Sequence, residues 1–174
     1  MRKKKKVWIL CWILIAIMMI SACDTIKYYQ RDSFYREGSD CDRLRFPLIK
    51  PYFAVYVNEE SGWQIPLGDI SNQNFRGYIN VPYVEKILVE NNVIMIYTPY
   101  QASVIGISEF KIINWFVLEP EKELESGFEN EEDFLEYLDE IGIDEPEWMN
   151  PDDVSLQFDE TRCLDWIPDC EESE

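Results

Sequence analysis

Carboxylates are the most abundant side chains in this sequence that could do chemistry, with 34 Asp and Glu among 174 residues and no histidine. Two carboxylates about 5–10 Å apart and flanked by aromatic rings could hydrolyse a glycosidic bond. Trp63 and Trp115 are candidates for the aromatic rings that would flank such a carbohydrate site. Glu85, Glu90 and Glu109, however, stand singly on expected strands, so we expect these carboxylates to face solvent.

The absence of histidine excludes several classes of active site. Ser-His-Asp and Cys-His catalysis need an imidazole, and so do histidine metal clusters. No two of the seven glycines have the spacing of a phosphate-binding or dinucleotide-binding loop. A cation site made of C-terminal acids is less favoured than a solvated acidic face, so we expect no cofactor and no metal. The acids considered for that site are Asp139, Asp144, Asp152 and Asp153.

Charge and composition exclude further classes of protein. The net charge is −18 at pH 7, whereas nucleic-acid binding needs clustered Lys and Arg. Hydrophobic residues make up 47% of the chain and aromatic residues 14%, which is typical of folded proteins rather than disordered ones. We therefore expect a folded protein with no nucleic-acid partner.

The N-terminal residues have the pattern of an export signal. Arg2 to Lys6 are five consecutive cations, and Val7 to Ile20 are fourteen residues that are all apolar or cysteine. The small residues Ser21 and Ala22 follow, directly before Cys23. A basic region, an apolar core and a small-residue cleavage site are typical of a secretory signal peptide. An uncleaved membrane anchor is the alternative, but this apolar stretch is shorter than the roughly 20 residues of a usual span.

The sequence Ile20-Ser21-Ala22-Cys23 resembles the lipobox of bacterial lipoproteins. This resemblance covers residues 1–23 and implies that Cys23 receives a diacylglycerol thioether and that a lipoprotein signal peptidase cuts before it. Acyl chains such as palmitate contribute about 0.8 kcal/mol per buried methylene, so two or three chains form a stable anchor. The implied location is the bacterial cell envelope, on a membrane and facing outside the cytoplasm. The mature part resembles small bacterial lipoproteins only generically.

Three cysteines remain once Cys11 is removed with the signal and Cys23 is lipidated. In an oxidising compartment, three thiols predict one disulfide and one free or intermolecular thiol. Cys163 and Cys170 could close a local loop, whereas Cys41 paired with either would join the N-terminal region to the C-terminal one. A redox-active Cys-x-x-Cys pair is absent from the sequence.

Acidic residues concentrate in the last third of the chain. Residues 23–118 contain 11 acids and 9 bases, whereas residues 119–174 contain 23 acids and 2 bases, a net charge of −21.

Four tether aromatics are expected to pack on the domain: Tyr28, Tyr29, Phe34 and Tyr35. We expect a signal peptide over 1–22, a lipidated N-terminus and tether over 23–45, a β-rich globular domain with a C-terminal helix over 46–143, and an acidic, proline-broken tail over 144–174.

Residues 50–118 have the composition of antiparallel strands, because aromatic and β-branched runs alternate with polar turns. Tyr52 to Val57 and Trp63 to Leu67 are expected to pair, and Pro66 predicts that the second strand lies at a sheet edge. Further strands are expected over 78–81, 102–107 and 111–118. The last of these is almost continuously apolar, as in a strand buried on both faces.

A hairpin is expected around Asn91 and Asn92. The flanking runs, Val84 to Glu90 and Val93 to Thr98, have strand composition, and asparagine tolerates the positive φ of a two-residue turn. A helix that begins at Pro82 is the alternative for the first run.

Residues 130–141 predict the clearest helix. Asn130 is a good N-cap, Asp133 lies where a carboxylate meets unsatisfied amides, and Gly142 is a typical helix end. The expected buried stripe comprises Phe134, Leu135, Leu138 and Ile141. The predicted fold class is therefore α+β, with an antiparallel sheet of about five to seven short strands and one C-terminal acidic amphipathic helix.

The tail beyond this helix is expected to be irregular, because Pro146, Pro151 and Pro168 interrupt it. Large apolar side chains should attach it to the domain. These are Trp148, Phe158, Leu164 and Trp166.

The leading functional interpretation is a lipid-anchored, non-catalytic protein-binding module. Its expected partner is a basic protein. One expected role is immunity or inhibition against a cationic toxin or enzyme, and another is assistance in envelope assembly. The alternative is an envelope hydrolase that acts on carbohydrate through a carboxylate pair. The candidate partner surface is the water-facing side of the expected helix: Glu131, Glu132, Glu136 and Asp139.

Overall fold

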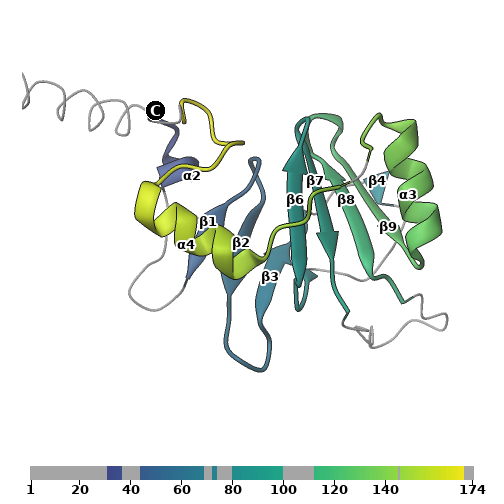
Figure 1. Ribbon diagram of the computed structural model, residues 1–174, viewed down its shortest axis with the longest axis horizontal. Helices are drawn as coiled ribbons and strands as arrows, with labels where there is room; N and C mark the ends of the chain where they lie inside the picture. The colour runs from purple at the N-terminus through teal and green to yellow at the C-terminus, as the bar shows by residue number, and fades with distance from the viewer. Residues whose placement is uncertain are drawn as a thin grey trace, which may run out of the picture.

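The structure, a computed structural model, describes residues 31–36, 44–68, 72–73, 80–99, 112–144 and 146–170. Cys23, Cys41, Glu109 and the strand expected over 102–107 lie outside these residues. The described chain is α+β, as predicted, but its strands form two sheets rather than one. Figure 1 shows the first sheet, the second sheet and a helix as three successive layers.

The first sheet has the antiparallel order β1-β2-β3-β5, with β1 (Arg45–Pro47), β2 (Phe53–Tyr56), β3 (Trp63–Pro66) and β5 (Asn80–Val81). The predicted pairing of β2 with β3 is confirmed, with Val55 opposite Gln64. The prediction that Pro66 places β3 at a sheet edge is wrong, because β3 lies between β2 and β5. Pro66 is the last residue of its strand, a position where a missing amide donor interrupts little of the ladder.

The second sheet has the order β4-β9-β8-β7-β6, with β4 (Asn72–Gln73), β6 (Lys86–Glu90), β7 (Val93–Tyr97), β8 (Trp115–Glu119) and β9 (Leu124–Phe128). All its pairings are antiparallel except that of β4 with β9. The predicted hairpin is confirmed and its helical alternative is wrong, since Asn91 and Asn92 join β6 to β7 with φ of 51° and 62°. A 3-10 turn, η1 (Pro120–Lys122), joins β8 to β9.

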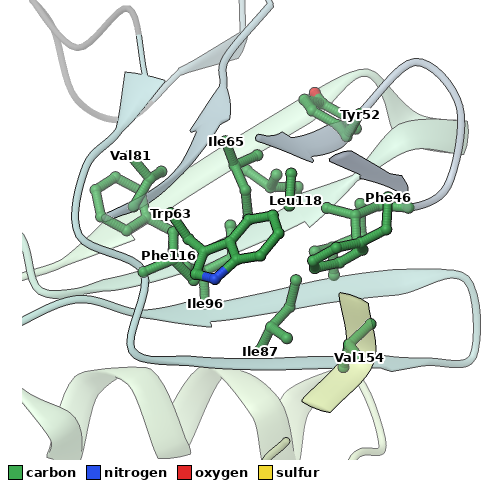
Figure 2. Close-up of a cluster of buried hydrophobic side chains, with 14 of the residues drawn as sticks. Phe46, Tyr52, Trp63, Ile65, Val81, Ile87, Ile96, Phe116, Leu118 and Val154 are labelled. Carbon is green, nitrogen blue, oxygen red and sulfur yellow. The ribbon is translucent and has the colours of Figure 1, made fainter. Parts of the chain in front are cut away.

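The second sheet is buried on both faces. Successive side chains of a strand point to opposite faces, so Phe116 and Leu118 of β8 face the first sheet while Trp115 and Val117 face the helix layer. This confirms the expectation of a doubly buried strand from the apolar run. The inter-sheet core, which Figure 2 shows, includes Phe46, Ile65, Ile87, Ile96, Phe116 and Leu118.

The predicted helix is present as α3 (Glu131–Glu140), and it covers the outer face of the second sheet (Figure 1). The Asn130 side chain accepts a hydrogen bond from the Asp133 amide at 2.9 Å, and Gly142 follows with φ of 79°. Phe134 and Leu138 are buried, and Ile141 is half-buried. The prediction that Leu135 is buried is wrong: it is 44% exposed, because a rotation of about 100° per residue turns it off the stripe.

The prediction that the tail is irregular is wrong for α4 (Pro151–Thr161). Pro151 begins this helix rather than breaking it, because the first helical amide has no partner to lose. The Asn150 side chain caps the helix by accepting from the Asp152 amide at 2.8 Å. Val154 and Phe158 of α4 belong to the inter-sheet core, so the folded part extends past residue 143.

The remaining attachments within the described ranges agree with expectation, whereas Tyr28 and Tyr29 lie outside those ranges. Leu164 is buried, whereas Trp148 and Trp166 pack partly buried against the cores. Tyr35, on the short helix α2 (Ser33–Arg36), is buried in the inter-sheet core and Phe34 packs against it. No helix within the described ranges is both long and apolar enough to span a bilayer.

Candidate functional site

The outward side of α3 carries the predicted partner surface, which we call the acidic face. Its four members are all exposed, and at 100° per residue they occupy one arc of the helix. The helix therefore brings together every residue predicted for this surface: Glu131, Glu132, Glu136 and Asp139.

No described cation neutralises the acidic face. From residue 119 onward the chain has only two bases, Lys122 and Arg162. Lys122 pairs with Glu119, and Arg162 lies 3.8 Å from Asp159. Within the described ranges, none of the four carboxylates of the acidic face takes part in an ion pair.

Helix stability does not explain the acidic face. Acids in the first turn favour a helix, but Asp139 and Glu140 lie in the last turn, where they meet the negative end of the dipole and no base compensates them. Glu132 and Glu136 are also like charges one turn apart, an arrangement that costs about 0.2–0.5 kcal/mol. These carboxylates therefore disfavour the C-terminal half of α3.

A groove of about 400 Å³ runs beside the acidic face, between α3 and the segment that follows it. Its apolar lining comprises Phe134, Leu135, Ile143, Pro146 and Trp148, and its charged lining comprises Glu131, Asp139 and Asp144. Charged residues of one sign thus surround an apolar floor.

The pocket beside Trp63 has a volume of about 300 Å³ and lies where the first sheet meets the start of α4. Its carboxylates, Glu59, Glu85 and Asp152, are all exposed, and Asp152 accepts a hydrogen bond from the Trp63 indole at 2.7 Å. That bond fixes the start of α4 to β3. Glu85 and Glu90 face solvent, as expected from the sequence.

Trp115, the other aromatic ring considered for a carbohydrate site, is buried under α3. Its ring centroid lies 4.9 Å from that of Phe134 and 5.8 Å from that of Trp148. The ring therefore belongs to the core between α3 and the second sheet, where it packs against other aromatic side chains.

Two carboxylates of the described residues are buried, and sequence reasoning did not identify either of them. Glu125 is fully buried and accepts hydrogen bonds from the Tyr52 hydroxyl and the Gly68 amide, both at 2.8 Å. Burial, followed by the bond to Glu125, raises the pKa of Tyr52. This contact joins a residue of the second sheet to two positions next to the first.

Glu119 is the second buried carboxylate, and it joins β8 to α3. It accepts from the Tyr137 hydroxyl and pairs with Lys122. Burial, followed by the bond to Glu119, raises the pKa of Tyr137 to about 12. Both buried acids have partners that account for their position, and the acidic strand residues carry no sequence signal that separates them from exposed ones.

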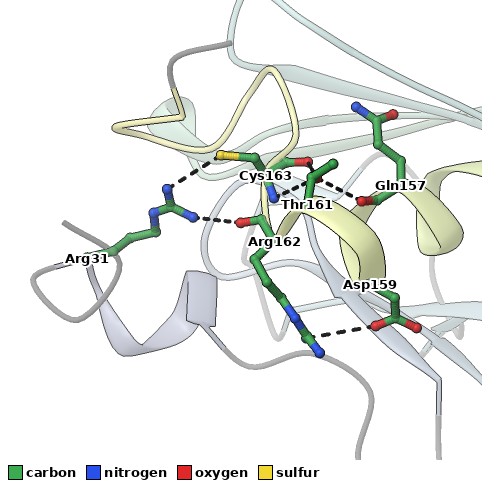
Figure 3. A network of polar contacts seen from close by, with 6 residues as sticks. All are labelled: Arg31, Gln157, Asp159, Thr161, Arg162 and Cys163. Atoms are coloured by element: carbon green, nitrogen blue, oxygen red, sulfur yellow. Dashed lines mark hydrogen bonds and ion pairs between the residues drawn. The ribbon is translucent and has the colours of Figure 1, made fainter. Parts of the chain in front are cut away.

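Figure 3 shows how Arg31 is tied to the residues at the C-terminal end of α4. Cys163 and Cys170 form a disulfide, the local pairing that the sequence left open beside two others. The guanidinium of Arg31 is buried against this loop and donates to the carbonyl oxygens of Arg162, at 2.8 Å, and Asp169, at 3.3 Å. The chain eight residues after Cys23 is therefore fixed beside the C-terminal end of α4.

The acids considered for a cation site are divided between two regions. Asp139 and Asp144 lie at the α3 groove, whereas Asp152 and Asp153 lie at the start of α4. Among the described residues, no three potential metal-ligating side chains converge. No family model, curated protein or solved structure matches the chain.

Proposed function

We propose that this protein is a lipid-anchored, non-catalytic binding module at the outer face of a bacterial membrane, and that the acidic face of α3 receives a basic protein partner. The observation that carries the proposal is the set of exposed carboxylates that make no ion pair within the described ranges, of which Glu136 and Asp139 disfavour the C-terminal half of the helix. Charges that cost stability are expected to persist where binding uses them.

The placement of the N-terminal segment supports the same proposal. Figure 1 shows α2 near one end of the molecule and α3 at the other, beyond both sheets. The chain that leads from the proposed anchor is held beside α4 by Arg31. This contact lies at the end of the molecule away from α3. The acidic face would then point away from the bilayer, whose anionic lipids would repel it.

Electrostatic attraction makes the proposal testable. Opposite charges accelerate encounter, and raising salt from 0.1 M to 1 M shortens the screening length from about 10 Å to about 3 Å. The immobilised protein is expected to capture a basic partner from envelope extract at low salt and to release it at high salt. Replacement of the four carboxylates of the acidic face by amides should weaken capture by about tenfold or more, a loss of about 1.4 kcal/mol.

The same amide variant should keep or raise the melting temperature, because it removes like-charge repulsion within α3. A matched control neutralises four exposed acids elsewhere, Glu60, Glu90, Glu160 and Asp165, with the same change in net charge. Capture that falls equally in both variants would indicate a net-charge effect, and capture unchanged by salt and by the amides would overturn the proposal.

Lipidation of Cys23 has a separate test. Metabolic labelling with an alkyne fatty acid should mark the wild-type protein, and Cys23→Ala should abolish the label and leave the precursor uncut. The reason is that both acylation and cleavage of a lipobox need the cysteine thiol. Cys41→Ala is the control and should keep the full label. Label that persists in Cys23→Ala would contradict the proposed anchor.

A further inference from the structure

We propose that the groove beside α3 binds a segment of the basic partner in which an aliphatic side chain is flanked by Lys or Arg. This inference rests on the proposed function and specifies the chemistry that the site recognises. It assigns the apolar contact to the groove floor and the ionic contacts to the carboxylates along its rim: Glu131, Asp139 and Asp144.

Leu135 provides the first step of the argument. It lines the groove and is 44% exposed, although it lies on a helix that buries the neighbouring Phe134 completely. Glu131 and Asp139 stand one turn before and one turn after it, so all three lie along the same line of α3. An aliphatic side chain between two carboxylates is complementary to an aliphatic side chain between two cations.

The opposite wall is held in place by the second sheet. Trp148 lies in the segment after α3, and its ring centroid is 6.0 Å from that of Phe134. The next residue, Met149, exchanges two backbone hydrogen bonds with Ile87 of β6, at 2.9 and 3.0 Å. The groove is therefore formed before any ligand binds, which lowers the ordering cost of binding.

Charge complementarity decides the occupant. Among the described residues, the groove lining contains three carboxylates and no cation. Lys and Arg can lay their methylene stems along apolar surface while their charged ends reach carboxylates. A purely apolar segment would leave the carboxylates without partners, and a purely cationic one would leave Leu135 in water.

Two synthetic peptides of equal charge would test this inference. One places leucines between lysines, and the other places serines at the same positions. Fluorescence anisotropy with the full chain in zwitterionic micelles should show about tenfold tighter binding of the leucine peptide, after subtraction of protein-free micelles. Leu135→Ala should remove most of this difference and leave binding of the serine peptide unchanged.

Leu156→Ala is the matched control, because Leu156 is 59% exposed on α4 and does not line the groove. Micelle binding cancels between the two leucine variants, so their difference reports the groove alone. Equal affinity for the two peptides, or a Leu135→Ala variant that behaves like Leu156→Ala, would overturn the inference. If the four-amide variant still lost binding in that case, the proposed function would stand. If neither salt nor the amides changed binding of either peptide, the proposed function would fail as well.

Discussion

Replacement of Phe134 by Ala is expected to lower the free energy of unfolding by about 3–5 kcal/mol, a large part of the 5–15 kcal/mol of a typical domain. The side chain is fully buried, and its ring stacks on Trp115 with a centroid distance of 4.9 Å. Its removal would leave a cavity between α3 and the second sheet, which the surrounding aromatic rings can fill only in part. Urea unfolding followed by near-ultraviolet circular dichroism measures the change.

Leu135→Ala is the control for this prediction, since the two residues are neighbours on α3. Leu135 is largely exposed, so its truncation should cost about 0.5 kcal/mol or less. Leu138 is buried beside Phe134, so its replacement by Ala should lower the free energy of unfolding by about 2–5 kcal/mol. If Phe134→Ala cost no more than Leu135→Ala, α3 would not be docked on the sheet in solution.

Local sequence signals predicted the elements whose chemistry is local. The Asn91-Asn92 pair predicted the hairpin because both residues adopt positive φ, a conformation that most side chains avoid. Asn130 and Gly142 predicted the two ends of α3 through a side-chain cap and a left-handed termination. In these cases a few neighbouring residues determine the structure.

The elements that sequence analysis missed depend on distant partners. β9 has weak strand composition and forms as the ladder partner of β8. The division into two sheets follows from a core shared by residues such as Phe46 and Phe116, which lie far apart in the chain. The start of α4 is different, because its signal is local: proline suits the first helical position when the preceding residue, here Asn150, caps the helix.

The candidate site was predictable only in part. The spacing of the acidic residues placed all four on the outward side of a helix, because helical periodicity is visible in the sequence. The groove beside them was not predictable, since it depends on Leu135 lying outside the buried stripe and on the bridge between Met149 and Ile87. The buried Glu125 was also missed, because its partners come from residues 52 and 68.

Phe158→Ala is expected to lower the free energy of unfolding by about 3–5 kcal/mol, although the sequence places this residue in an acidic tail. Its side chain is fully buried in the inter-sheet core, together with Val154 from the preceding turn of α4. The helix covers the first sheet near β1, so a cavity at Phe158 would weaken the contact between two layers rather than loosen a terminus. Urea unfolding again measures the loss.

Leu156→Ala separates burial from helix formation, because the residue lies on the same helix but is 59% exposed. Truncation there keeps a good helix former and should change stability by about 0.5 kcal/mol or less. The disulfide loop and the Arg31 contacts follow directly after α4, so Phe158→Ala should also speed amide exchange over residues 162–170, while Leu156→Ala should not. If the two variants had equal stability, residues 151–161 would be a tail attached to the domain rather than part of its core.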